Sequence, residues 1–174
     1  SLTDYEPTNA GRKIEQFVDE NLSNWYVRLC RRRFWKGDYS EDKIAAYQTL
    51  YECMSTISKL IAPIAPFFSD WLFKQLNEGS NLESCDSVHL ALFPVAKDEA
   101  IDVNLEKRME YAQRISSLAL SLRKKEKIRV RQPLQKLIVP ALSQDFKDKV
   151  EAVQDLILSE INVKEVIVTV DTDG

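Results

Sequence analysis

The residues with the clearest chemical potential lie in one short segment, LSNWYVRLCRRRFWK at positions 22–36. It carries five basic side chains and no acidic one, namely Arg28, Arg31, Arg32, Arg33 and Lys36. Such cations can neutralise RNA phosphates, and the flat rings of Phe34 and Trp35 can stack on unpaired bases. The segment therefore predicts a surface for single-stranded RNA. Two other interpretations stay open: the cations can complement the negative end of a helix, or they can pair with acidic residues elsewhere.

A second basic segment spans positions 123–136 and holds seven lysines and arginines against one acid, Glu126. Its candidates for phosphate contact are Arg123, Lys124, Lys127, Arg129 and Arg131. A solvated turn is the alternative interpretation of this segment. The whole chain has a net charge of −3, so its clustered bases indicate a directed anionic partner rather than general coating of nucleic acid.

Groups for catalysis or metal binding are scarce in the sequence. It has no glycine-rich phosphate loop, no HxxxH pair and no nucleophile elbow. Its one histidine, His89, lies in an extended apolar segment, and we expect a structural role for it. Cys30, Cys53 and Cys85 are widely spaced and form no CxxC pair, which predicts packed, reduced thiols in the cytoplasm. We therefore expect no catalysis, cofactor or metal in this chain.

Hydrophobic periodicity predicts the helix that positions the first basic segment. It should begin near Ala10, because apolar residues then recur every three or four positions, at Ile14, Val18, Leu22, Trp25 and Leu29. At about 100° per residue, the same face continues into Arg32, Arg33 and Lys36. Unpaired buried charge is costly, so this end should overhang the bundle and be solvated until Gly37 ends the helix.

Three further helices are predicted. Ser40 should cap the second, which ends at Pro63 and buries Tyr47, Leu50, Tyr51, Met54, Ile57 and Ile61. Pro66 should begin the third, whose apolar residues are Phe67, Phe68, Trp71, Leu72 and Leu76. After a loop at 77–87 and the extended segment VHLALFP, a fourth helix should run from about Asn104 to Lys127. The residues expected to face inward are Leu105, Met109, Ala112, Ile115, Ala119 and Leu122. The same face continues into Arg123 and Lys127, so this end should also overhang the bundle and be solvated or meet a partner.

The hydrophobic period changes after position 133. Strands at 134–139 and 163–170 flank a helix at 143–161, which predicts a small βαβ-like lobe. The expected fold class is mainly α: a helical bundle at 1–128 with a small α/β lobe at 129–174. No apolar run approaches the roughly 20 residues that span a bilayer. The polar start without methionine suggests excision from a longer polypeptide.

Several segments, in this order and spacing, resemble a known family. They are AGRKIEQFVDENLSNWYVRLCRRRFW, LIAPIAPFFSDWLFKQL and SVHLALFP, followed by an RxRQPLxxLIVPAL pattern. Together they are similar to the anticodon-binding domain of class I isoleucyl-tRNA synthetases, over residues 5 to about 140. The resemblance implies a helical bundle that binds the tRNA anticodon stem and loop through Arg28, Arg31, Arg32 and Arg33. Lys36 joins this set on charge alone.

The resemblance also implies a parent enzyme that activates isoleucine with ATP and Mg²⁺, loads it onto tRNA and edits misacylated valine. The HIGH and KMSKS motifs of that chemistry do not occur here, so this fragment itself should be non-catalytic. Its expected partners are the tRNA anticodon arm and the catalytic and editing domains of the same parent chain, in a cytoplasmic monomer. The cysteine-rich zinc module of some members is missing, so no metal is inferred. The alternatives are the domain of a valyl, leucyl or methionyl enzyme, or a structural bundle that docks on the synthetase body without touching RNA.

Overall fold

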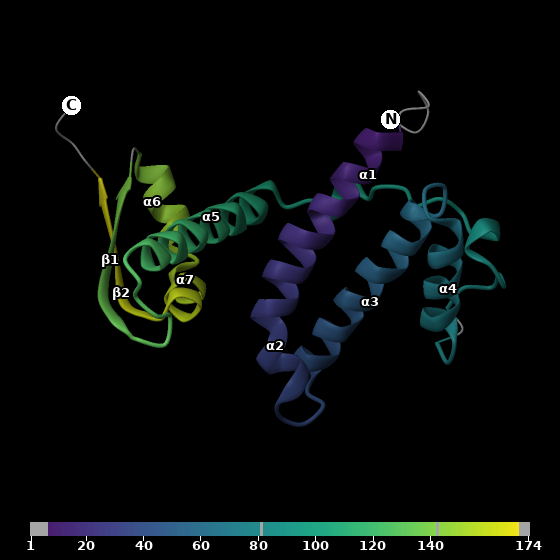
Figure 1. The fold of residues 1–174 in the computed structure, drawn as a ribbon, viewed down its shortest axis with the longest axis horizontal. Helices are drawn as coiled ribbons and strands as arrows, with labels where there is room; N and C mark the ends of the chain where they lie inside the picture. Colours follow the sequence, from purple (N-terminus) through teal and green to yellow (C-terminus); the bar gives the residue numbers. More distant parts are fainter. Residues whose placement is uncertain (1–6, 81, 142, 171–174) are drawn as a thin grey trace. The chain divides into compact units, whose positions relative to one another are not determined.

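The computed structural model describes residues 7–80, 82–141 and 143–170 of the chain (Figure 1). Contacts divide the chain into two compact units, Ser1–Ala96 and Lys97–Gly174, hereafter the N-terminal and C-terminal units. The division lies ahead of the long helix α5 (Val103–Lys125), whereas the sequence had suggested a boundary after residue 128. The reason is that α5 packs against the two helices that follow it in the C-terminal unit.

The first helix of the N-terminal unit is continuous but changes its type in the middle. It comprises α1 (Pro7–Gln16), the π-helix η2 (Phe17–Val27) and α2 (Arg28–Trp35). In a π-helix each hydrogen bond spans five residues instead of four, so equivalent side chains lie further apart in sequence. The Asn24 amide shows this spacing, because its Nδ2 donates to Asp19 Oδ1 five residues earlier, at 2.8 Å.

The π-helical stretch corrects the predicted apolar stripe. Leu22 and Trp25 are buried as expected, but downstream the buried position is Cys30 and not Leu29. A stripe drawn at a constant α-helical angle loses its phase across η2, because a π-helix turns less per residue. The side of α2 that meets the bundle therefore differs from the predicted one.

The connection to the next helix follows the sequence prediction closely. Gly37 has a left-handed φ of +78° just after α2 ends, a conformation that glycine adopts without strain. Ser40 caps α3 (Glu41–Ile61), since its hydroxyl accepts the backbone N–H of Lys43 at 3.3 Å. Of the predicted stripe, Ile57 is buried, whereas Tyr47 is 42% exposed.

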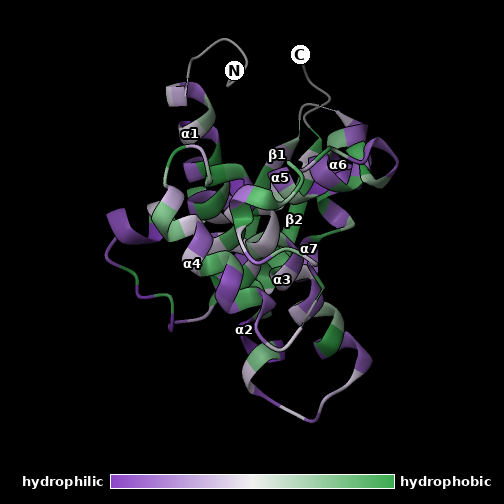
Figure 2. Ribbon diagram, turned by 90° about the vertical axis from the view of Figure 1, so that its right-hand side faces the viewer, coloured by the Kyte–Doolittle hydropathy of each residue, from purple (hydrophilic) through white to green (hydrophobic). Residues whose placement is uncertain are grey.

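Helix α4 (Pro66–Asn77) packs against α3, with its proline in the first turn as predicted. It buries Ser69, Leu72 and Phe73, while Phe67, Phe68 and Trp71, which the sequence placed in its apolar set, are exposed. In Figure 2, hydrophobic and hydrophilic residues are interleaved along α3 and α4, the pattern of amphipathic helices.

The segment predicted to be extended after α4 begins instead with a short 3₁₀ turn, η3 (Val88–Leu90). Asp70 of α4 holds it: its Oδ1 accepts the Ser87 hydroxyl at 2.7 Å and the Val88 N–H at 3.1 Å, and its Oδ2 pairs with Lys74 at 2.7 Å. These partners, Lys74 first, lower the pKa of Asp70 to about 2. Asp70 thus joins η3 to α4.

The C-terminal unit contains the predicted strand-helix-strand lobe. Its elements are η4 (Asp98–Ala100), α5, β1 (Leu134–Ala141), α6 (Gln144–Glu151), α7 (Gln154–Ile161) and β2 (Val163–Val170). The two strands are parallel, with Leu134 opposite Val163 and Val139 opposite Val168. The single helix predicted at 143–161 is broken into α6 and α7, where Val153 leaves the helical conformation (φ −123°).

Small and branched apolar side chains form the core of this unit. Ala112 and Ala119 of α5 meet α6 and α7, whose Val150, Ile157 and Ile161 are fully buried. The mainly α fold with a small parallel sheet near its C-terminus, as predicted, is confirmed. No helix in the described ranges combines the length and apolarity that crossing a membrane requires.

Candidate nucleic-acid interface

Helix α2 turns one basic face to solvent. Arg28, Arg31, Arg32 and Trp35 are all exposed, and at about 100° per residue they lie within an arc of about 100°. The opposite side of the helix carries the buried Cys30. We call these four residues the basic face of α2. The sequence had placed Arg32, Arg33 and Lys36 on one face, and the phase shift at η2 changes that grouping.

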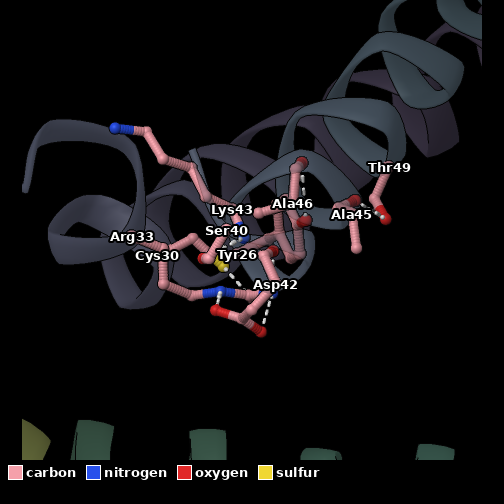
Figure 3. Close-up of polar contacts among 9 residues, drawn as sticks. All are labelled: Tyr26, Cys30, Arg33, Ser40, Asp42, Lys43, Ala45, Ala46 and Thr49. Atoms are coloured by element: carbon pink, nitrogen blue, oxygen red, sulfur yellow. Dashed lines mark hydrogen bonds and ion pairs between the residues drawn. The ribbon is translucent and has the colours of Figure 1, made fainter. Parts of the chain in front are cut away.

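Arg33 belongs to the inner side of α2, where it joins the first turn of α3 (Figure 3). Its Nε donates to Asp42 Oδ2 at 2.7 Å, and its Nη2 donates to Asp42 Oδ1 at 2.6 Å and to the Asp42 carbonyl at 2.8 Å. The Asp42 carboxylate raises the pKa of the Arg33 guanidinium further above its ordinary value. For Arg33, the ion-pairing alternative is the one that the structure shows.

Phe34 is engaged in packing between the helices. Its ring lies 5.0 Å from that of Tyr47 and 6.5 Å from that of Tyr26, measured between centroids. The Tyr47 hydroxyl donates to the Phe34 carbonyl at 3.1 Å, and the Tyr26 hydroxyl donates to the Ala46 carbonyl at 3.0 Å. Burial raises the pKa of Tyr26. Of the two predicted stacking residues, Trp35 has the free ring, at 81% exposure.

The turn between α2 and α3 adds two side chains to this region. Lys36 is exposed, as its predicted role requires. Tyr39, which the sequence analysis missed, is 79% exposed and lies under the Lys43 ammonium, whose Nζ is 4.8 Å from the ring centroid. The same Nζ donates to the Gly37 carbonyl at 3.2 Å. A tyrosine two residues after a helix-ending glycine was the signal available in the sequence.

The second basic segment is organised around Arg123. The prediction of an overhanging helix end is wrong for this residue, whereas Lys127 is exposed. Arg123 does face inward, but it is buried, with 4% of its surface exposed. Its Nη2 donates to the carbonyls of Arg129 at 2.8 Å and Val130 at 3.2 Å, and also to the carbonyl of Gln132. The chain folds back over this helix end, so three backbone carbonyls surround Nη2, while Nε and Nη1 are buried without a hydrogen-bond partner among the described residues.

Leu122, expected inward, is instead 59% exposed. The residues of α5 that pack inward are Ala112, Ser116, Ala119 and Arg123. Of the residues predicted to face inward, Ala112 and Ala119 are buried, whereas Leu105 near the start of the helix is 50% exposed.

The remaining candidates of the second segment lie on the surface. Lys124, Lys127, Arg129 and Arg131 are exposed, as is Lys125, which the sequence analysis left out of the set. Lys127 has a left-handed φ of +56°. Asn162 adds a second anchor from the end of α7, because its Nδ2 donates to the Val130 carbonyl at 2.9 Å. Carbonyls of this loop point inward, while its basic side chains are exposed.

The cysteines and acidic residues offer no competing chemistry. Cys30, Cys53 and Cys85 are free thiols, Cys30 accepts a contact from Arg33 Nη1 at 3.4 Å, and burial raises the pKa of Cys53. Across the parts of the chain that the structure describes, no three His, Cys, Asp or Glu side chains gather where they could hold a metal ion. His89 is exposed at η3.

The class of protein is given by a family profile described as "Anticodon-binding domain of tRNA ligase", which matches residues 1–138. The chain belongs to this family, and the resemblance seen in its sequence is confirmed. The family's description implies binding of tRNA.

Three curated relatives of this chain are all isoleucine–tRNA ligases. Isoleucine–tRNA ligase of Cytophaga hutchinsonii is 55% identical over 174 residues, which are 100% of this chain and 16% of that protein. The isoleucine–tRNA ligase of Porphyromonas gingivalis is 54% identical over 173 residues (99% and 15%), and isoleucine–tRNA ligase 2 of Bacillus cereus is 40% identical over 171 residues (98% and 16%). The chain thus spans about one sixth of the curated relatives it matches, and it corresponds to the anticodon-binding part of isoleucine–tRNA ligase.

Proposed function

We propose that this chain is the part of an isoleucine–tRNA ligase that grips the anticodon arm of its tRNA. The observation that carries the proposal is the basic face of α2: three arginines and a tryptophan, all exposed, on one side of a helix in a chain of the anticodon-binding family. Phosphate contacts supply affinity and orientation, whereas contacts to unpaired bases supply recognition. This face offers both kinds of group.

The candidate residues divide into two roles. Arg28, Arg31, Arg32 and Lys36 in the N-terminal unit, and Lys124, Lys127, Arg129 and Arg131 in the C-terminal unit, are exposed and serve as phosphate contacts. Arg33 and Arg123 support these surfaces from within, because their guanidinium groups are bonded to Asp42 and to backbone carbonyls. Of Phe34 and Trp35, the two residues predicted to stack on bases, Trp35 is the candidate that we retain, since the Phe34 ring packs against other aromatic rings.

The chemistry of the whole enzyme lies outside this chain. By its likeness to isoleucine–tRNA ligases, the parent protein would bind ATP and Mg²⁺, load isoleucine and edit valine, in a cytoplasmic monomer. The present part would deliver the tRNA and contact the catalytic and editing domains of the same polypeptide. It would carry no cofactor of its own.

The test is titration of the 174-residue chain with tRNA(Ile) and with the same tRNA altered in its anticodon. We expect tighter binding of the unaltered tRNA. In the double variant Arg31→Ala, Arg32→Ala, the plot of log K against log salt should become less steep. The magnitude of its slope should decrease by about 1.4–1.8, which corresponds to two lost phosphate contacts. An unchanged salt dependence in the double variant, together with equal affinity of the wild-type chain for both tRNAs, would refute the proposal.

One observation favours a second candidate function, docking on the body of the synthetase. Phe67, Phe68 and Trp71 of α4 are 92%, 54% and 57% exposed, and a large exposed apolar patch marks an interaction surface. If docking is the only role, the isolated chain should ignore both tRNAs. The same titration therefore separates the two functions.

A further inference from the structure

Two aromatic rings flank the turn that follows the basic face of α2. Trp35 and Tyr39 are 81% and 79% exposed and lie four positions apart in sequence. Large aromatic side chains normally bury most of their surface, so two such rings beside a cluster of arginines need an explanation. Among the described residues, ring-to-ring contacts occupy Tyr26, Phe34 and Tyr47 but neither of these two.

The turn that carries the rings is fixed on both sides. Before it, the Lys36 N–H donates to the Arg32 carbonyl at 3.0 Å, and after it the Ser40 N–H donates to the Asp38 carbonyl at 2.9 Å. Lys43, a largely buried residue, bonds the Gly37 carbonyl through its Nζ. Little backbone freedom is then left to lose when a ligand binds, which favours affinity.

The surroundings of each ring point to the chemistry of the ligand. The Lys43 ammonium covers one face of Tyr39 at 4.8 Å, and the high exposure of the side chain leaves the other face open. Trp35 lies on the same helix face as Arg31 and Arg32, whose side chains are exposed. Acidic residues are also present, since the exposed Asp38 and Glu41 flank Tyr39 in sequence, so the cations lie on the α2 side of the rings. Flat rings next to these arginines fit a polyanion with unpaired bases that approaches along α2 better than they fit an apolar protein surface.

We propose that Trp35 and Tyr39 form a stacking surface for unpaired bases of an RNA loop, beside the phosphate contacts of α2. This inference rests on the proposed function and deepens it, because it assigns the loop of the anticodon arm, and not its stem, to this turn. Bases inside a duplex have no free faces to offer, so these two rings contribute nothing to duplex binding.

The experiment compares Trp35→Ala and Tyr39→Ala with the ring-keeping variants Trp35→Tyr and Tyr39→Phe. Leu92→Ala is the control, because Leu92 is a highly exposed large apolar side chain (90%) that belongs to neither candidate binding surface. Affinities of the 174-residue chain are measured for an anticodon-arm hairpin and for a duplex of the same stem without a loop. Circular dichroism verifies that each variant keeps its helix content.

Each alanine variant should lower hairpin affinity by about 5- to 150-fold, the value of one lost base stack, and should leave the salt slope unchanged. Duplex affinity should not change, and the ring-keeping variants and the control should bind within about threefold of the wild type. Wild-type hairpin binding by both alanine variants would overturn the stacking surface, and so would an equal loss on the duplex. The double variant Arg31→Ala, Arg32→Ala distinguishes this failure from a failure of the proposed function. If it still reduces the salt dependence of binding, the tRNA-binding function stands and only the stacking surface is refuted.

Discussion

Arg33 should contribute more to the stability of the fold than Arg31 does. Replacement of Arg33 by Gln removes two bonds to the Asp42 carboxylate and one to its carbonyl, all at 2.6–2.8 Å. Because the two side chains are 36% and 68% exposed, solvent screens the pair. Exposed pairs contribute about 0.2–1 kcal/mol, and the two-pronged geometry with the extra carbonyl bond supports a value near the top, about 1 kcal/mol.

The matched control is Arg31→Gln, the same chemical change two residues earlier, at an exposed position. For a unit of this size, a loss of about 1 kcal/mol lowers Tm by about 4–8 °C, whereas an exposed surface change stays within about 0.5 kcal/mol. Thermal unfolding followed by circular dichroism measures both. RNA binding should depend on the other arginine. The magnitude of the slope of log K against log salt should decrease in Arg31→Gln and stay unchanged in Arg33→Gln. Equal Tm shifts in the two variants would refute the division of this arginine run.

Three further predictions follow from other contacts. Arg123→Met should destabilise the C-terminal unit by about 1–3 kcal/mol, because buried carbonyl acceptors lose their donor, and should speed hydrogen exchange at Gln132. Asp70→Asn should be less stable than the wild type above pH about 4, with the difference vanishing as the pH falls through about 2, because the Asp70 pKa is lowered by folding. Ser40→Ala should cost about 1 kcal/mol by removing the cap of α3, measured by denaturant unfolding.

Each of these has its own contradicting result. Unchanged hydrogen exchange in the Arg123 variant would mean that the basic loop does not depend on that buried cation. For Asp70, the NMR chemical shift of the Val88 backbone amide should follow the protonation of the Asp70 carboxylate, with a midpoint near pH 2. A midpoint near pH 4 would contradict the bonds by which Asp70 holds η3. Ser40→Gly serves as the control for the cap, since glycine costs only a few tenths of a kcal/mol at that position.

Local signals in the sequence were sufficient for most element boundaries. Gly37, Ser40 and Pro66 each act within a few residues of their own position, and all three lie where the prediction put them. The two predicted strands flank a helix that is long enough for a parallel crossover, so the lobe was also predictable. Its helix was not predicted to break at Val153, because the apolar spacing continues across that point.

Most of the errors concern side-chain direction, although the segment predicted to be extended begins with the 3₁₀ turn η3. A π-helical stretch leaves no mark on hydrophobic spacing, so nothing in the sequence showed that Cys30 would be buried in place of Leu29. Nor did it show that Arg32 would leave the face that Arg33 shares with the bundle. Arg123 was assigned to RNA because it belongs to a cluster of basic residues at a helix end. Its partners are carbonyls of a loop six to nine residues later, and main-chain acceptors are invisible in a sequence.

We infer that the basic face of α2 contacts the anticodon arm. The most direct measurement is an NMR titration of the 174-residue chain with the anticodon-arm hairpin, following arginine Nε–H and tryptophan indole N–H signals. The signals of Arg31, Arg32 and Trp35 should shift in parallel and saturate together, while that of the buried Trp25 should stay in place. Shifts confined to Trp71 of α4, with those three signals unmoved, would contradict the account.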